Sequence, residues 1–264
     1  MRQVLTLLKP RFMSFKNRSL SKNGKGRELR FLLLGTMGLL FWGGSFLIFY
    51  RVLAYFQRFE EFGDILTYKL LSMALITLFS LLLFSGILTS LSKLYLSKDL
   101  PLVHSMPVLR EKIFLARWME GTVDSSWMVL IYSLPLFLSY GMVYQTGFLY
   151  YSMVGINILP FCLIASSLSA LVVMMAAVFL PAGHIRSVFV FLGLLAFLFL
   201  LLSFRLIRPE KFVNPQSFGS LILTLKALET SHSPFLPTTW FFDSLRASLS
   251  GSAKSALFHS ALSW

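Results

Sequence analysis

Residue types that often carry chemistry are few in this sequence, and their spacing matches no common catalytic or metal-binding motif. The four histidines are scattered and form no H-E-x-x-H pair, so we do not expect a metalloprotease site. The single cysteine, Cys162, lies in an apolar stretch, which excludes an internal disulfide and a cysteine zinc site. Glu60 and Glu61 are adjacent acids, but Ile65 stands where a CAAX-type intramembrane protease would have an arginine, so they indicate a surface ion cluster.

The phosphate-binding motif G-x-x-x-x-G-K-[ST] does not occur, so we do not expect this chain to bind ATP in a P-loop. We therefore predict no catalytic residue, no metal, no cofactor and no enzymatic activity.

The segment Lys93–Asp124 has the residues most suited to docking a partner. Ser105 and Pro107 predict a helix start and Gly121 a stop, with a short helix over Val108–Glu120 between them. On a helical wheel, two arginines share one side and apolar residues share another: Arg110 and Arg117 against Val108, Phe114, Leu115, Trp118 and Met119.

Two interpretations of this segment remain open. It is either a membrane-surface helix that joins two spans or a helix that docks a soluble partner. Under the second interpretation the candidate docking residues are Lys98, Asp99, Leu100, Pro101, Pro107, Arg110, Lys112, Phe114, Arg117 and Trp118.

The elements that must position this segment are membrane spans. Phe31–Tyr50 and Leu70–Ser92 carry no charge over 20 and 23 residues, and a span needs about 20. Ser125–Gly183 carries none over 59 residues, and as one helix it would reach about 90 Å, so it must turn back. The most polar point, Tyr144–Gly147, predicts that turn. The resulting spans are Ser125–Val143 and Gly155–Leu180, and Ser187–Phe204 predicts a fifth.

Charge predicts the orientation of these spans. Nine basic residues and one acid precede Phe31, which places the N-terminus in the cytoplasm by the positive-inside rule. Lys93–Asp124 then returns to the cytoplasmic side. The first 30 residues are either an interfacial helix on anionic headgroups or a disordered basic leader. No acid or base lies inside a span, which argues against a proton-coupled carrier or a voltage sensor.

Inside the spans, prolines and small residues predict kinks and close contacts. Pro135 and Pro160 each remove a backbone hydrogen bond, and Asn157 is predicted to bond a neighbouring helix rather than a substrate. These three are the candidate pathway and kink residues. Nearer the C-terminus, Leu221–Thr230 and Trp240–Leu249 are too short to span and predict two re-entrant half-helices with a proline break between them, or else an exposed outer loop.

Several stretches resemble the exporter permeases related to the ABC-2 class. They are Tyr95–Pro101, Met106–Val108, Ile113–Arg117, Ser125–Leu130 running to Pro135, Tyr140–Gly141 and the tail Ser233–Trp240. The resemblance implies an all-α polytopic bundle in the inner membrane, in which the docking residues couple to an ATPase.

The domains expected on this basis are a basic leader (1–30), a transmembrane bundle (31–204) with its coupling segment (93–124), an outer-face segment (205–254) and a truncated sixth span (255–264). The predicted function is a permease subunit energised by a separate ABC ATPase, and the alternative is a non-transporting scaffold that recruits a soluble partner. The expected partners are that ATPase, a second copy or second permease half, and the lipid bilayer, with no nucleic acid.

Overall fold

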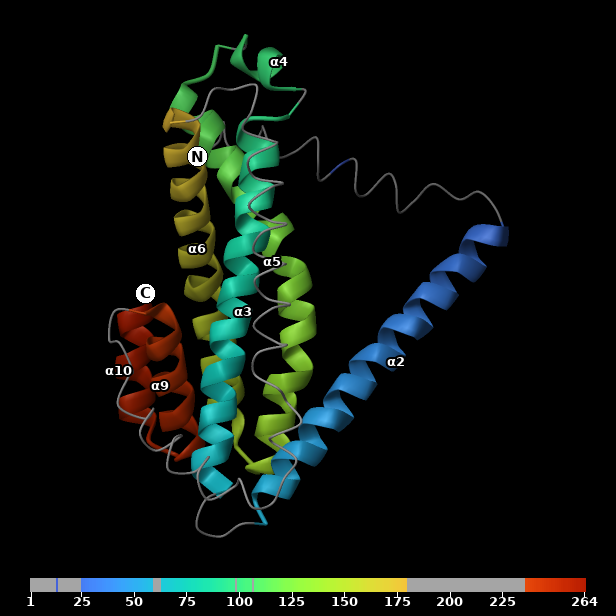
Figure 1. Cartoon of the computed structure of the whole chain (residues 1–264), viewed down its shortest axis with the longest axis vertical. Coiled ribbons are helices and arrows are strands. Elements are labelled where there is room, and N and C mark those ends of the chain that lie inside the picture. Colours follow the sequence, from blue (N-terminus) through green and yellow to red (C-terminus); the bar gives the residue numbers. More distant parts are fainter. Residues whose placement is uncertain (1–12, 14–24, 59–62, 98, 106, 180–235) are drawn as a thin grey trace.

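The computed structural model describes residues 13, 25–58, 63–97, 99–105, 107–179 and 236–264. The regular structure in these ranges is helical throughout (Figure 1), in the order α2 (Lys25–Phe56), α3 (Gly63–Leu94), α4 (Leu100–His104), α5 (Arg110–Val143), α6 (Phe148–Phe179), α9 (Pro237–Leu249) and α10 (Ala253–Ser263). The all-α prediction is confirmed at this level. The predicted N-terminal interfacial helix lies outside the described residues.

Four helices of the described part are long and apolar enough to cross a membrane. They cover Leu32–Phe56, Gly63–Leu94, Arg110–Val143 and Phe148–Val178. The prediction of five complete spans and a truncated sixth is therefore wrong for this part of the chain. The expected fifth span, Ser187–Phe204, lies outside the described residues, and α10 has 11 residues where a span needs about 20.

The predicted reversal between the third and fourth spans is confirmed. Helix α5 ends at Val143 and α6 begins at Phe148. Gln145 takes a positive φ of 47° in the turn. This left-handed conformation is one that few residues other than glycine and asparagine adopt readily, so the turn is tight.

Helix α5 corrects the prediction of a separate docking helix. It runs without a break from Arg110 to Val143, so the expected helix Val108–Glu120 is the first part of a long spanning helix. Gly121 does not end it, and is buried against Thr89 of α3. Burial of Gly121 against a neighbouring helix outweighs the usual tendency of glycine to end helices.

Helix α3 packs along both α5 and α6 (Figure 1). A close contact with α6 occurs at Gly86, where an added Cβ would lie 2.5 Å from Oγ of Ser169. Ser169 in turn donates to the carbonyl of Leu83, and Oγ of Ser85 donates to the carbonyl of Ser125 on α5. Small residues and hydroxyl-to-carbonyl bonds therefore join these helices, as is usual inside membranes.

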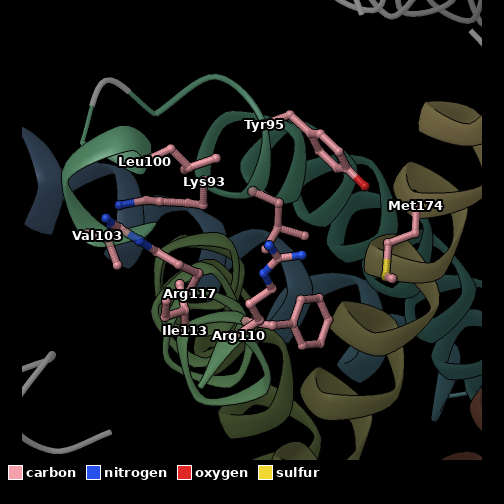
Figure 2. A pocket seen from close by; sticks show the side chains of 10 residues that line it. Lys93, Tyr95, Leu100, Val103, Arg110, Ile113, Arg117 and Met174 are labelled. Carbon is pink, nitrogen blue, oxygen red and sulfur yellow. The ribbon is translucent and has the colours of Figure 1, made fainter. Parts of the chain in front are cut away.

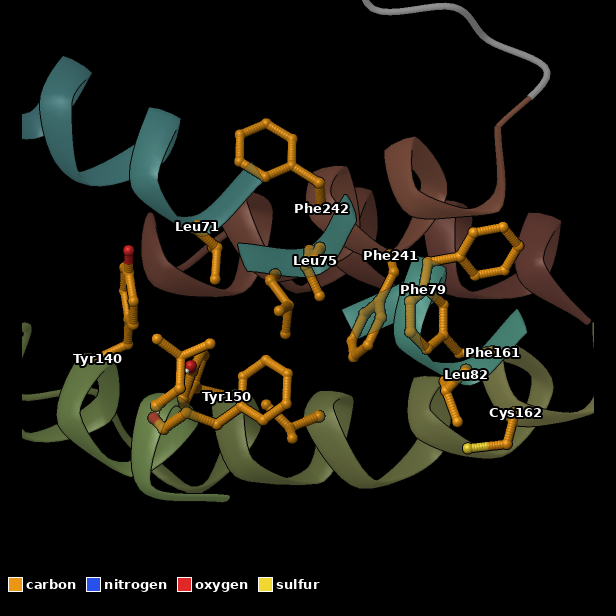
Figure 3. Packing of buried hydrophobic residues seen from close by; sticks show 14 of the residues in the cluster. Leu71, Leu75, Phe79, Leu82, Tyr140, Tyr150, Phe161, Cys162, Phe241 and Phe242 are labelled. Atoms are coloured by element: carbon orange, nitrogen blue, oxygen red, sulfur yellow. Dashed lines mark hydrogen bonds between the residues drawn. The ribbon is translucent and has the colours of Figure 1, made fainter. Parts of the chain in front are cut away.

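The core contains a series of aromatic rings from four helices (Figure 3). Phe161 of α6 lies 5.3 Å, centroid to centroid, from Phe79 of α3 and 5.1 Å from Phe241 of α9. Phe241 also lies 5.8 Å from Phe137 of α5. Because Phe241 reaches this cluster, α9 is an integral part of the bundle.

Helices α9 and α10 form a short antiparallel hairpin against α6 and the first half of α3 (Figure 1). The turn between them is at Ser250–Ser252, where Gly251 has φ of 78°. The predicted half-helix Trp240–Leu249 lies within α9, whose first residue is Pro237. Proline suits a helix start because its missing N–H would have no partner there. The other predicted half-helix, Leu221–Thr230, lies outside the described residues.

Asn157 anchors this hairpin, which confirms that it bonds neighbouring helices. It is fully buried in α6. Its Nδ2 donates to Oγ of Ser244 on α9 at 3.0 Å, and its Oδ1 accepts from Oγ of Ser263 on α10 at 3.0 Å. One amide thus joins three helices.

Helix α2 crosses α5 and diverges from the bundle toward its N-terminal end (Figure 1). The crossing is held at Pro135 of α5. Proline has no N–H for the carbonyl of Ile131 one turn earlier, and the indole Nε1 of Trp42 donates to that carbonyl at 3.2 Å. By contrast, an added Cβ at Gly35, Gly38, Gly43 or Gly44 would meet none of the described residues within 4 Å, so these glycines make no close contact with another described helix.

Trp42→Phe should destabilise the chain by about 1 kcal/mol, because it leaves the Ile131 carbonyl without a donor. Thermal unfolding of the purified chain in detergent measures the change. Trp127→Phe is the matched control, since Trp127 is an exposed indole on α5. Equal shifts for both variants would show that the Trp42 hydrogen bond contributes nothing.

Candidate functional site

A cavity of about 150 Å³ opens where α3, α4, α5 and α6 end or begin. Lys93 and Tyr95 lie at the end of α3, Arg110 and Phe114 open α5, and Met174 lies in the last turns of α6 (Figure 2). Three of these four helices, α3, α5 and α6, are long and apolar enough to cross a membrane. The cavity therefore lies where candidate spans end or begin.

Ion pairs join the two long helices beside this cavity. Nζ of Lys93 lies 2.8 Å from a carboxylate oxygen of Glu120 and 3.2 Å from one of Asp124. Arg117 bonds the other oxygen of Glu120 at 3.2 Å and reaches Asp99 at 3.1 Å. The side chains of Arg117 and Glu120 are only 15% and 14% exposed, so this contact is protected from water far more than a surface salt bridge.

Asp99 attaches α4 to this network. It occupies the N-cap position of α4, although its side chain makes no capping bond. The hydrogen bond from Arg117 holds the pKa of Asp99 below its usual value. The carboxylate therefore stays charged, and this link between α4 and α5 persists in mildly acidic solution.

Arg110 differs from the other two cations of the cavity. It is exposed, and among the described residues it has no ion-pair partner. In Figure 2 its guanidinium lies between Lys93 and Met174, facing the open space. The cavity thus has one cation, Arg110, without an ion-pair partner among the described residues, and two cations, Lys93 and Arg117, that are paired with acids.

The structure brings several of the predicted docking residues together. Leu100 and Phe114 line the cavity with Arg110 and Arg117. Pro101 lies in the first turn of α4, Pro107 in the connection to α5, Lys112 in the first turn of α5 and Trp118 two turns further on. Lys98 lies outside the described residues. The exposed apolar side predicted for a docking helix is present at Phe114, Leu115 and Met119.

Sequence reasoning missed the residues contributed by the neighbouring helices. Lys93, Tyr95 and Met174 line the cavity, and Glu120 with Asp124 holds Lys93 in place. One feature of the sequence could have pointed to Lys93 and Glu120. They lie near the two ends of the segment between two spans, where charged residues are expected at a membrane boundary.

The comparison with protein families matches nearly the whole described bundle. Residues 22–264 match the family described as "Putative ATP-binding cassette". The chain belongs to this family. No curated protein and no solved structure matches this chain.

Membership of the ATP-binding cassette family confirms a relation to ABC transporters and corrects two expectations. The family description names an ATP-binding cassette rather than a permease. The predicted function, a permease subunit or alternatively a passive scaffold, is therefore overturned. The expectation that the chain has no enzymatic activity is overturned by the same description, which points to ATP hydrolysis in this chain.

Although the chain belongs to this family, its sequence contains no P-loop motif. One partial match is Ser248–Ser255, which ends in Lys-Ser but has Ser248 and Ala253 where the motif has glycines. It connects α9 to α10 rather than a strand to a helix. Among the described residues we also find no group of three histidine, cysteine or acidic side chains placed to hold a metal ion.

The structure places the three predicted pathway residues apart from one another. Pro135 contributes to the crossing with α2, Asn157 faces α9 and α10, and Pro160 lies one turn further along α6. None of them lines the cavity at the ends of α3 and α5.

Proposed function

We propose that this chain is a membrane-embedded ATP-binding cassette protein that uses ATP to move its spanning helices. The observation that supports this most directly is the family match, which covers residues 22–264 and so includes all four candidate spans. The nucleotide-dependent activity would then belong to the same chain as the membrane bundle.

The cavity end of the bundle is the place where we propose that this movement begins. Helix α4 is joined to α5 by the pair Asp99–Arg117, and α5 to α3 by the pairs of Lys93 with Glu120 and Asp124. A displacement of α4 would therefore pull on two spanning helices at once. The docking residues on α4 and the first turns of α5 would receive that displacement.

Orientation and assembly are further parts of the proposal. The basic excess before the first span supports an N-terminus and a cavity end on the cytoplasmic side of the inner membrane. A second copy or half, and an additional ABC ATPase as partner, stay predictions that the experiment below also tests.

ATP hydrolysis by the purified chain in lipid nanodiscs tests the proposal. We expect phosphate release above the background of empty discs, without any added protein. We also expect Mg-ATP to change the labelling rate of a cysteine placed at the exposed Leu102 of α4, but not that of one at the exposed Phe148 at the opposite end of the bundle. Cys162 is buried.

Absence of hydrolysis by the chain alone would overturn the proposal. Hydrolysis that appears only after a second subunit is added would do the same, and would identify the partner. Hydrolysis with unchanged labelling at Leu102 would contradict the proposed starting point of the movement.

A further inference from the structure

In a membrane, the cavity would lie beside the headgroups, because Lys93, which lines it, directly follows the charge-free stretch Leu70–Ser92 of α3. Lys93 is in the last turn of α3 and Arg110 is the first residue of α5, and both helices are candidate spans. Met174 lies near the end of a third candidate span. This depth holds whichever way the chain is inserted.

The charge lining the cavity suits an anion. Of the described residues, three cations line it, namely Lys93, Arg110 and Arg117, and no acid does. Lys93 and Arg117 are paired with acids of the ion-pair network, whereas Arg110 is not paired within the described part of the chain. The planar guanidinium of arginine matches the oxygens of a phosphate with two parallel hydrogen bonds.

The size of the cavity indicates how much of a ligand it can hold. At about 150 Å³ it has room for roughly five waters, each of which takes about 30 Å³ in the liquid. Pockets that enclose a whole organic ligand begin at roughly 300 Å³. A phosphate group fits, but an entire nucleotide does not.

The walls around the cations are apolar and open to the surroundings. Tyr95, Phe114 and Met174 are 40%, 38% and 42% exposed, and Figure 2 shows Met174 across the open space from Arg110. A ligand with a charged head and a hydrocarbon part would contact both kinds of surface. Basic pockets between spanning helices bind lipid headgroups in this way.

We propose that this cavity binds a phosphate group, with Arg110 as its direct contact, and that an anionic phospholipid supplies it. The headgroup phosphate enters between Arg110 and Lys93, while the acyl chains lie along Phe114 and Met174 in the bilayer. This site rests on its own geometry and does not depend on the proposed ATP hydrolysis.

Lipid retention by the purified full chain tests the proposal. Protein is reconstituted in nanodiscs of equal phosphatidylglycerol and phosphatidylcholine, extracted in mild detergent, and its bound lipid is counted by native mass spectrometry. We expect the wild type to retain phosphatidylglycerol at least tenfold over phosphatidylcholine. Arg110→Ala should abolish that preference. Arg110→Lys keeps the charge but loses the planar guanidinium that makes two parallel hydrogen bonds, so it should reduce the preference in part.

Arg51→Ala is the matched control, because Arg51 is an exposed cation near the opposite end of a spanning helix. It should keep the wild-type preference. Unfolding midpoints measured beforehand establish that Arg110→Ala is folded, as expected for an exposed side chain. If Arg110→Ala retains phosphatidylglycerol as the wild type does, or if the wild type shows no preference, the site does not exist.

A competition arm identifies the source of the phosphate. Millimolar inorganic phosphate or ATP should leave the retained phosphatidylglycerol unchanged. If either one displaces the lipid from the wild type, and binds in phosphatidylcholine-only discs with a dependence on Arg110, a soluble phosphate is the ligand and the lipid proposal is overturned.

Discussion

Gly86→Val should lower the unfolding midpoint of the purified chain sharply, whereas Gly35→Val should leave it nearly unchanged. A Cβ at position 86 would lie 2.5 Å from Oγ and 2.9 Å from Cβ of Ser169. Ser169 cannot turn away without losing its bonds to the carbonyls of Leu83 and Ala165. We expect a loss of about 3 kcal/mol, the upper part of the usual range for overpacking.

The control uses the same substitution in another spanning helix. An added Cβ at Gly35 would meet no atom of the described residues within 4 Å, so we expect Gly35→Val to act through helix propensity. Ser169→Gly combined with Gly86→Val should recover most of the loss, because the two side chains then exchange places. A double variant as unstable as Gly86→Val would show that this contact is not the cause.

Asn157→Leu should destabilise the chain by about 2 kcal/mol and loosen the α9–α10 hairpin. The substitution keeps the side-chain volume but removes the bonds to Ser244 and Ser263, each of which is worth roughly 1 kcal/mol between membrane helices. The hairpin should then dissociate locally before the rest of the bundle unfolds.

Protease digestion and thermal unfolding measure the two effects separately. Cleavage near Gly251, in the turn between α9 and α10, should become faster in Asn157→Leu. Ser167→Ala is the control, because Ser167 is an exposed serine of α6 whose hydroxyl bonds only within its own helix. If cleavage near Gly251 is equally slow in both variants, the amide does not hold the hairpin.

Apolar length and charge were sufficient to predict the spanning helices of the described part. The charge-free run Ser125–Gly183 had to reverse because it was too long for one span, and its most polar point located the turn. These signals are local in sequence and follow from the thickness of a membrane. The reversal at Tyr144–Gly147 could therefore be predicted without any contact between helices.

The start of α5 could not be predicted by the same reasoning. Six charged residues between Arg110 and Asp124 suggested a segment outside the membrane, and Gly121 suggested its end. Lys93 pairs with Glu120 and Asp124 across two helices, so charges far apart in sequence neutralise each other. Such pairing depends on which helices become neighbours, which a single sequence does not reveal.

The cavity illustrates a similar division between local and tertiary information. Arg110, Phe114 and Arg117 could be selected as candidates because they share one short segment. Tyr95 and Met174 could not, because they reach the cavity from α3 and α6 through the packing of those helices. The role of Trp42 was also hidden, since nothing in the sequence indicates which donor reaches the carbonyl that Pro135 leaves free.

Because α5 is continuous from Arg110 to Val143, a movement at one end of this helix can be transmitted to its other end. Glu120, where Lys93 holds the helix, is about 15 Å along the axis from Arg110, and Ile131 is about 17 Å further in the same direction. A rigid helix turning about that ion pair moves its two ends in opposite directions, so the carbonyl of Ile131 travels about as far as Arg110. A displacement of 2 Å at Arg110, taken on the order of a small helix shift, would thus become about 2 Å at the carbonyl that accepts from Trp42 at 3.2 Å. If the carbonyl moves away from Trp42, the two atoms come to lie about 5 Å apart, which is too far for a hydrogen bond. An event at one end of α5 would then loosen its contact with α2.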